Sequence, residues 1–418
     1  MHERPLTKDA LARAAELVEE AYSAYNAQEM ELGEQRTHEA EALLLGDLSP
    51  SARIVALRGR SLREWRRGDL EACIRTIGGL LYYLGVLGDE AALIRTLCND
   101  AAARVEAGAP IAIERLDWAL LAARRHPSPV YELMVRASRA NALESSTDPL
   151  ACYFEAASCV RLARSAGEAE WLAWAVSSCS DALHRMALPH RRLTVTREGT
   201  RAAEAAGQAR RVLGCKLDLF AALIGVGDLA AAEALGAELQ EIIDESRRDA
   251  FVSCYLLNVG ELALALGQPA RASAAFQGAH RARVEVGRAT TRWLPILGEL
   301  RAAALAGDTA AAVPLADRLD ADPHAPGAAR LFARVLATDG RAAARDATHA
   351  LDMAAAMASR AGLGWLEHLI RKETWAARWL AGDEAGAARG AADWEESRRE
   401  LARRIDAMVE PIFEPDPA

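Results

Sequence analysis

The segment YLLNVGELALALGQPARASAAFQGA, residues 255–279, consists of two apolar stretches of helical composition that meet at Gly267-Gln268. The same kind of turn returns along the chain every 39 or 40 residues. The turns of this series are Gly68-Asp69, Gly108, Asp148, Leu188-Pro189, Gly227-Asp228, Gly267-Gln268 and Gly307-Asp308, and a further Gly-Asp pair stands at Gly382-Asp383. A fixed period of this length is typical of a solenoid, in which each repeat is one helix pair that cannot bury its apolar face alone.

The Gly-Asp turns have a direct physical interpretation. Glycine adopts the left-handed conformation that ends one helix, and aspartate caps the next helix by accepting hydrogen bonds from backbone N–H groups. We therefore predict two helices of about 15–17 residues in each repeat, beginning near residue 50.

Composition supports an all-α fold. The chain has 418 residues, more than one ordinary compact core accommodates. Alanine, the best helix former, is used heavily, and aromatic residues make up only 5%. No alternating β-branched run of strand length is present. The expected fold is a right-handed α-α superhelix of about eight or nine helix pairs.

The predicted organisation is one solenoid between two extended ends. Residues 1–8 are expected to be disordered, residues 9–410 to form a single continuous solenoid, and residues 411–418 to form an extended tail with three prolines. Departures from the repeat near residues 190 and 322 mark two candidate seams.

Charge is concentrated at the two ends of the chain. The net charge is −9, of which residues 1–50 contribute −7 and residues 391–418 contribute −4, so the interior is close to neutral. Acidic ends suit the solvated caps of a repeat stack and argue against nucleic-acid binding, which needs a basic face. They also argue against end-to-end assembly into a structural polymer, because like ends repel.

The sequence predicts a cytoplasmic location. No apolar signal segment follows Met1, and the longest apolar stretch, residues 77–88, is too short to span a bilayer. No membrane partner is therefore expected. The seven cysteines are an odd number spread through predicted helix interiors, which is typical of reduced, buried thiols.

Residues 255–279 resemble a tetratricopeptide repeat (TPR). The motif's small, turn, small, aromatic and small positions are matched in order by Gly260, Gly267, Ala272, Phe276 and Ala279. Other repeats depart from the motif, because the position of its first small residue holds Phe220, Leu300 or Trp375. The 40-residue period is longer than a standard TPR and is more similar to the helical repeats of the maltose-regulon activator family. The resemblance covers about residues 50–390 and implies a superhelix that binds partners along its surface.

Catalytic and metal-binding patterns are missing. The chain contains no nucleotide-binding glycine loop, no zinc-protease pattern and no serine-hydrolase pattern. One candidate metal cluster is formed by Cys152, Cys159, Cys179 and His184, but zinc sites favour closer cysteine pairs. We interpret these cysteines as small buried residues and predict no metal, no cofactor and no enzymatic activity. An enzyme would need titratable residues gathered in one pocket, whereas repeats disperse them.

One turn is unusually basic. His184 and His190 flank it together with Arg191 and Arg192. We interpret this segment as a solvated turn, and an anion site is the alternative.

Repeat position identifies candidate binding residues. In TPR-like stacks the first helix of each pair lines the concave face, and the residue nine positions before the turn points into it. That position is occupied by Asn99, Arg139, Asp218 and Asn258, and Glu261 and Arg301 lie three residues further on in their repeats. An asparagine amide both donates and accepts hydrogen bonds, and arginine offers a fork to carboxylates. The hypothesis is that these six residues form a partner-binding groove, and the alternative is a solvated polar face.

The last predicted helix, about residues 391–409, has two interpretations. A single stripe along it contains Trp394, Leu401, Ile405 and Met408. Such a stripe is typical of a capping helix that covers the final repeat, and its spacing also fits a coiled-coil seam in a homodimer.

These observations predict a protein–protein interaction module. The module is an adaptor, scaffold or regulatory subunit whose groove receives a peptide or a partner helix. The alternative function is a sensor in a bacterial regulatory system, which binds a small molecule or signalling peptide in the groove and changes its superhelical pitch.

Overall fold

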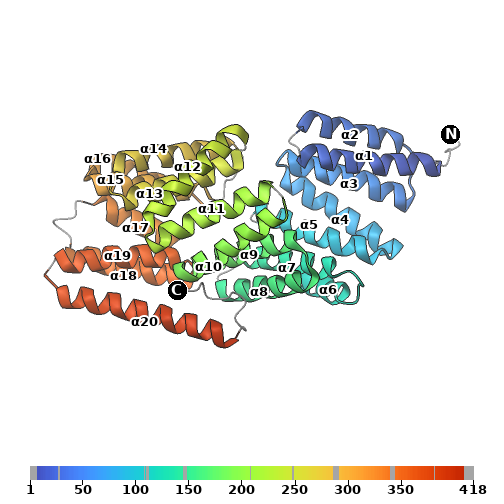
Figure 1. Ribbon diagram of the computed structural model, residues 1–418. Coiled ribbons are helices and arrows are strands. Elements are labelled where there is room, and N and C mark those ends of the chain that lie inside the picture. The colour runs from blue at the N-terminus through green and yellow to red at the C-terminus, as the bar shows by residue number, and fades with distance from the viewer. Residues whose placement is uncertain are drawn as a thin grey trace. The chain divides into compact units, whose positions relative to one another are not determined.

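The computed structural model describes residues 7–26, 29–107, 109, 113–144, 148–207, 209–246, 249–285, 291–338, 344–380 and 382–408 (Figure 1). Within these residues it contains twenty α-helices and no strand, which confirms the all-α prediction. The described helices follow one another as ten pairs, where the sequence predicted about eight or nine.

The helices divide into two compact units, residues 1–145 and 146–418. Unit 1 contains α1 (Lys8–Asn26), α2 (Met30–Leu43), α3 (Pro50–Arg66), α4 (Leu70–Leu87), α5 (Glu90–Ala107), α6 (Ile113–Ala123) and α7 (Pro129–Glu144). Unit 2 contains α8 (Pro149–Ala166), α9 (Ala169–Arg185), α10 (Pro189–Ala205), α11 (Ala209–Val226), α12 (Leu229–Ser246), α13 (Asp249–Ala265), α14 (Pro269–Glu285), α15 (Trp293–Ala306), α16 (Thr309–Ala321), α17 (Gly327–Ala337), α18 (Ala344–Arg360), α19 (Gly364–Leu380) and α20 (Glu384–Met408).

The predicted domain boundaries remain predictions. A single solenoid over residues 9–410 and seams near residues 190 and 322 are not decided by the division into two units. Residues 1–6 and the predicted tail 411–418 lie outside the described residues.

The periodic turns have the predicted geometry. Gly68 has φ 76° and ends α3, and the side chain of Asp69 accepts a hydrogen bond of 3.2 Å from the backbone N–H of Ala72 at the start of α4. The same pairing of a left-handed glycine with a capping aspartate occurs at Gly307-Asp308, where the N–H of Ala311 donates over 2.9 Å. The predicted turn at Gly108 lies outside the described residues.

The turn between α9 and α10 is different. Its left-handed residue is Ala187, with φ 54°, and no other described residue except glycine has a positive φ. A side chain in this conformation is strained by about 1 kcal/mol or more. The sequence pattern marked this turn only as a break at Leu188-Pro189.

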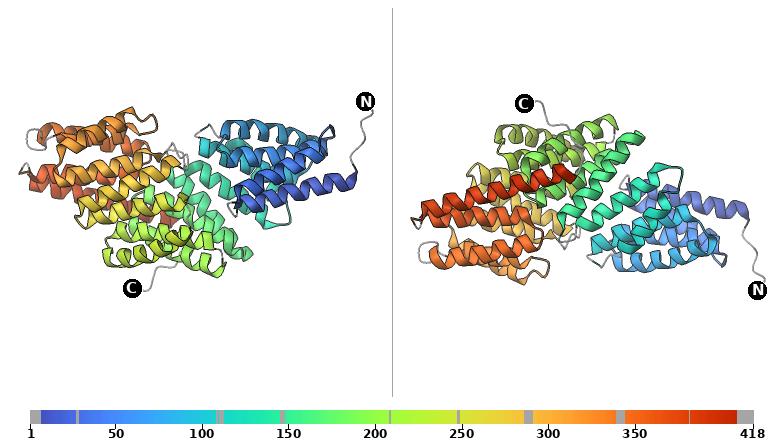
Figure 2. Two further views of the ribbon diagram at one scale, coloured as in Figure 1. Left: turned by 90° about the horizontal axis from the view of Figure 1, so that it is seen from above. Right: turned by 90° about the horizontal axis from the view of Figure 1, so that it is seen from below.

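Unit 2 is built of two layers of helices, which run alongside one another in Figure 2. Each even-numbered helix from α10 to α18 packs against the odd-numbered helices before and after it, and α20 packs against α19. Odd-numbered helices also contact each other, from α9 to α17, and α19 returns to contact α9. Because the odd-numbered layer closes on itself, it is the inner layer of the unit.

An aromatic ring and two glycines join three successive helices of unit 2. Phe276 on α14 is 1% exposed, and a methyl group at Gly260 on α13 would stand 2.6 Å from its Cε1 atom. A methyl group at Gly298 on α15 would stand 2.4 Å from the same atom. The small TPR-like position is therefore small because the ring occupies the space above it.

The preceding repeat reverses this arrangement. Phe220 on α11 occupies the position equivalent to Gly260, and it is fully buried. The space for its ring is left by Gly236 on α12, whose added Cβ would lie 3.1 Å from the ring. The departure from the TPR motif at Phe220 is thus matched by a glycine on the partner helix.

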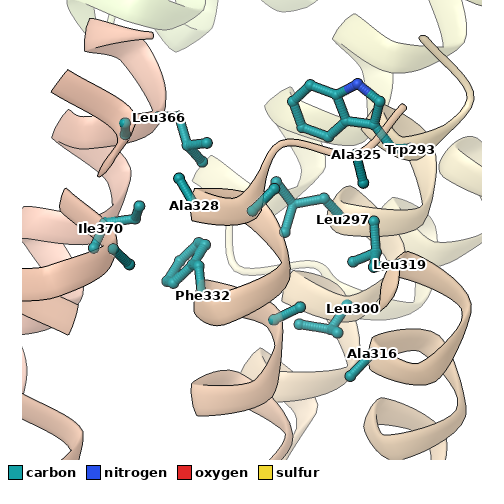
Figure 3. Close-up of a cluster of buried hydrophobic side chains, with 14 of the residues drawn as sticks. Trp293, Leu297, Leu300, Ala316, Leu319, Ala325, Ala328, Phe332, Leu366 and Ile370 are labelled. Carbon is teal, nitrogen blue, oxygen red and sulfur yellow. The ribbon is translucent and has the colours of Figure 1, made fainter. Parts of the chain in front are cut away.

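The apolar core continues as far as α19. Figure 3 shows Leu297 and Leu300 of α15, Phe332 of α17, and Leu366 and Ile370 of α19 in one cluster. This cluster fixes α19 to the repeats that precede it.

Helix α4 corrects one expectation from the sequence. It spans 18 residues with a mean hydropathy of 1.3, so by length and composition it is one described helix that could cross a membrane. It packs between α3 and α5 and buries Ile77, Leu80 and Leu84, while Tyr82 and Val86 are exposed. The core helices of soluble proteins also meet these two criteria.

We predict that Gly260→Ala destabilises unit 2 by about 1–3 kcal/mol, because the new methyl group overpacks the Phe276 ring. The opposing gain in helix propensity is about 1 kcal/mol. Urea unfolding followed by circular dichroism measures the difference.

Gly214→Ala on α11 is the control for this prediction. Its Cβ would lie at an ordinary 3.8 Å from Phe251, so this variant is expected to be as stable as the wild type or more stable. Equal effects of the two substitutions would contradict the proposed packing.

Candidate functional site

Four of the six predicted groove residues lie on inner helices of unit 2. Asp218 is on α11, Asn258 and Glu261 are on α13, and Arg301 is on α15. The other two lie in unit 1, where Asn99 is on α5 and Arg139 is on α7. The structure therefore groups four predicted residues in one unit and places two in the other.

The four residues of unit 2 bridge successive repeats. Nδ2 of Asn258 donates a hydrogen bond of 3.0 Å to the carbonyl oxygen of Leu217 on the preceding inner helix. Nη1 of Arg301 donates to Oε1 of Glu261 over 2.6 Å. Each contact spans 40 or 41 residues, which is one repeat. Some of the polar groups that were predicted to bind a partner thus form hydrogen bonds between neighbouring helices.

The two residues of unit 1 have different surroundings. Asn99 is exposed, and Arg139 forms an ion pair with Asp117 of α6. The adjacent Asp100 is buried, and its carboxylate lies 2.9 Å from Nε of Arg104 and 3.8 Å from Nη1 of Arg115.

Sequence reasoning missed a polar cluster on α9–α11. Asp218 accepts a hydrogen bond from the hydroxyl of Ser177, and Asp181 stands on the same helix as Ser177. Arg192 is 7% exposed, and its Nε donates to Oγ of Ser180 over 3.0 Å. Its Nη1 lies 3.3 Å from Nδ1 of His184. The turn interpreted as solvated therefore contains a buried arginine.

The sequence did contain a signal for this cluster. Asp181 lies seven residues before Leu188, the position that holds a glycine or an apolar residue in the repeats around Gly260, Phe220 and Leu300. Glu261 and Arg301 stand six residues before their turns, so the repeat places them one position further along their inner helices than Asp181. A carboxylate at a normally apolar repeat position points to a polar function there.

Burial sets the protonation of the cluster. Loss of hydration, and then the negative charge of Asp181, raise the pKa of Asp218 to about 7. Burial likewise raises the pKa of Asp181. By surface area both residues are only partly buried, so they retain some contact with solvent.

His184 is uncharged at neutral pH. Loss of hydration, and then the neighbouring charge of Arg192, hold the pKa of its imidazole well below the usual value. The residue nevertheless keeps an exposed edge, while its ring stacks on Trp365 of α19 with centroids 5.6 Å apart. Trp365 in turn stacks on Trp293 of α15 at 6.1 Å.

The cysteines considered as metal ligands lie elsewhere. Cys152, Cys159 and Cys179 are fully buried, and burial raises the pKa of the Cys179 thiol well above its usual value. Among the described residues, no three His, Cys, Asp or Glu side chains are grouped so that they could hold a metal ion.

The apolar stripe of α20 is used within the chain. Trp394 is 8% exposed and Ile405 is 1% exposed. The guanidinium of Arg398 lies 4.1 Å from the ring centroid of Trp394, and the ring of His368 on α19 stacks against the same indole. These contacts match the capping interpretation, and a homodimer through this helix stays a prediction. The side chain of Met408 lies outside the described residues.

Two solved structures share the fold of this chain. A Rap protein in complex with competence and sporulation factor is 12% identical, with a TM-score of 0.51 over 90% of this chain and 99% of the Rap chain. The apo form of the quorum sensor NprR from B. thuringiensis is 13% identical, with a TM-score of 0.50 over 90% of this chain and 96% of NprR. At these identities the likeness establishes a TPR-like helical repeat fold. The finer resemblance to maltose-regulon activator repeats stays a prediction.

No protein-family model matches the chain, and no curated protein sequence matches it.

We predict that Asp218 makes the stability of unit 2 depend on pH. Its folded-state pKa of about 7 lies above the ordinary 3.8, so folding favours the protonated form. Its contribution to stability is complete below the unfolded-state pKa and is lost as the pH rises through about 7. Asp218→Asn removes this loss, so the variant is expected to exceed the wild type in unfolding free energy by on the order of 1 kcal/mol at pH 8.

Urea unfolding between pH 4 and pH 8 measures this difference. The gap between Asp218→Asn and the wild type is expected to widen up to about pH 7 and then to stay constant. Asp393→Asn, at an exposed position of α20, is the control. A gap for Asp218→Asn that does not change with pH would show that Asp218 is not the titrating group.

Proposed function

We propose that the inner surface of unit 2 binds an extended polypeptide segment and that the protein acts as a non-catalytic regulatory binding protein. The supporting observation is the polar column on the inner helices α9, α11, α13 and α15. It contains two pairs of polar residues 40 apart, Asp218 with Asn258 and Glu261 with Arg301, together with Asp181 of α9, on a layer that otherwise packs through apolar residues.

The chemistry of this column suits a peptide backbone. An extended peptide presents N–H and C=O groups at regular intervals, and it needs acceptors and donors at regular intervals in return. Asp181 and Asp218 supply acceptors, and Asn258 keeps its amide oxygen in addition to the N–H that it donates to Leu217. Arg301 and Glu261 add a guanidinium and a carboxylate one repeat apart.

The structural likenesses support a regulatory role. The Rap protein was solved with competence and sporulation factor, and NprR is a quorum sensor. Transfer of that role to this chain is part of the proposal. The two forms of the proposal are an adaptor that receives a segment of a partner protein and a sensor that responds to a signalling peptide.

Peptide selection tests the proposal. A random dodecapeptide display library is selected on the full-length protein, and calorimetry measures the binding of the enriched synthetic peptides. We expect that Asn258→Ala combined with Arg301→Glu weakens binding at least about tenfold, because the column loses an amide and places two carboxylates together.

Arg281→Glu is the matched control. It makes the same charge change as Arg301→Glu, at an exposed position on the even-numbered helix α14, and it is expected to leave binding unchanged. Failure to enrich any peptide, or equal binding by the wild type and a folded double variant, would refute the proposed site.

A further inference from the structure

The inner layer of unit 2 closes on itself through a small set of contacts, which we call the closure. Nε of Arg185 at the end of α9 donates to the carbonyl oxygen of Gly362, which precedes α19, over 3.3 Å. Nη1 of Arg398 on α20 donates to the carbonyl oxygen of Met186 over 3.0 Å. Arg191 of α10 forms an ion pair with Asp406 of α20. These partners are separated by 177 to 215 residues along the chain.

The closure includes one close approach between backbones. A methyl group at Gly364, the first residue of α19, would stand 2.3 Å from the carbonyl oxygen of Arg185. Only glycine leaves room for the end of α9 at this point. Any side chain larger than hydrogen at residue 364 therefore pushes α19 away from α9.

The two sides of α19 are held by different kinds of contact. Leu366 and Ile370 belong to the apolar cluster that extends back to Trp293 of α15, and no residue of α9 or α10 belongs to that cluster. Toward α9 and α10, the contacts include two hydrogen bonds to carbonyl oxygens, one partly exposed ion pair, one ring stack and the close approach at Gly364. Partly exposed polar contacts contribute little, because the separated groups are hydrated equally well. The closure therefore relies on polar and stacking contacts outside the apolar cluster that joins α19 to the preceding repeats.

The closure is connected to the inner polar cluster through His184. One face of its imidazole stacks on Trp365 of α19, and its Nδ1 lies 3.3 Å from Arg192, beside Asp181 and Asp218. Separation of α19 from α9 removes Trp365 from this ring and opens the edge of the cluster to solvent. The state of the closure and the surroundings of the two carboxyls are therefore coupled.

The turn between α9 and α10, which takes part in the closure, also contains a strained backbone residue. Ala187, with φ 54°, follows Met186, whose carbonyl accepts from Arg398. Strained residues are found at switch regions, among other functional sites.

We propose that unit 2 alternates between this closed form and an open form in which α19 and α20 leave the α9–α10 turn, and that opening admits a polypeptide to the inner surface. The admission of a polypeptide, which we call gating, depends on the proposed function, whereas the opening does not. Arg191, Arg398 and Gly364 set the balance between the two forms.

The opening is tested without a ligand. Spin labels are attached at His190→Cys on α10 and Glu400→Cys on α20, both exposed, with Cys254 replaced by Ala because the other six cysteines are buried. Pulsed electron paramagnetic resonance then measures the distance distribution. We expect one dominant short distance in the otherwise unchanged protein and a larger population at longer distance in Arg191→Glu, where Asp406 becomes repulsive.

A double variant with exchanged charges distinguishes opening of the closure from local damage to the structure. Arg191→Glu combined with Asp406→Arg re-forms the ion pair with its charges exchanged, so the short distance is expected to return. Gly364→Ala is a second route to the open form, and Gly214→Ala is its control. If Arg191→Glu and Gly364→Ala are folded by circular dichroism and keep the short distance, the opening is refuted.

The gating is tested by the association rate of an enriched peptide. We expect Arg191→Glu to raise the association rate constant at least fivefold, and the charge-exchanged double variant to return it to the wild-type value. An unchanged rate in a variant that is open by distance refutes the gating. If the distances respond and no peptide binds any variant, the proposed function and the gating fail together, while the opening stands.

Discussion

The fold depends on how the side chains of each helix pair together fill the space between the two helices. Where the first helix of a pair has glycine, as at Gly260, the second supplies a phenylalanine, and where the first has Phe220, the second supplies Gly236. The same rule applies to Trp375 of α19, whose Nε1 atom would lie 2.8 Å from a methyl group at Gly390 of α20. Close packing requires only that the two side chains together fill the gap. The repeat therefore keeps a constant helix spacing while its large residue changes sides.

A constant helix spacing has a consequence for the polar residues. Because successive inner helices are related by nearly the same displacement, residues 40 apart lie in one column, and a side chain in one repeat reaches the next. Arg301 reaches Glu261 in this way, and Asn258 reaches the backbone at Leu217. Polar columns of this kind stabilise the stack and also present regularly spaced groups on its inner surface. The proposed binding surface and the contacts between repeats thus use the same residues.

The sequence was sufficient for local structure and insufficient for closure. Turns such as Gly68-Asp69 follow from the backbone preferences of two adjacent residues, so their positions and geometry were predictable. The exchange between Phe220 and Gly236 was also visible in the sequence, but only when both helices of the pair are considered together. The contact between Arg185 and Gly362 depends instead on the rotation accumulated over five repeats. A small change in rotation per repeat shifts the last helix by many ångströms. The total rotation depends on all five repeats and is not determined by any short stretch of sequence.

The position of Asp181 and Asp218 near the closure offers a reason for their burial. Burial raises the pKa of Asp181 and of Asp218, while the charges of Arg192 and, for Asp181, of Arg185 and the hydrogen bond from Ser177 to Asp218 oppose this shift. Such a cluster is costly in a sealed core, where a leucine pair would be more stable. In the proposed opening, its neighbour His184 loses the contact with Trp365 while the apolar core of α15–α19 is kept, which gives the cluster a place beside a contact that can separate. In the proposed function, a bound polypeptide supplies hydrogen-bond partners to this carboxyl cluster and thereby stabilises it. The buried carboxyls that destabilise the protein without a ligand would therefore favour the form that binds one.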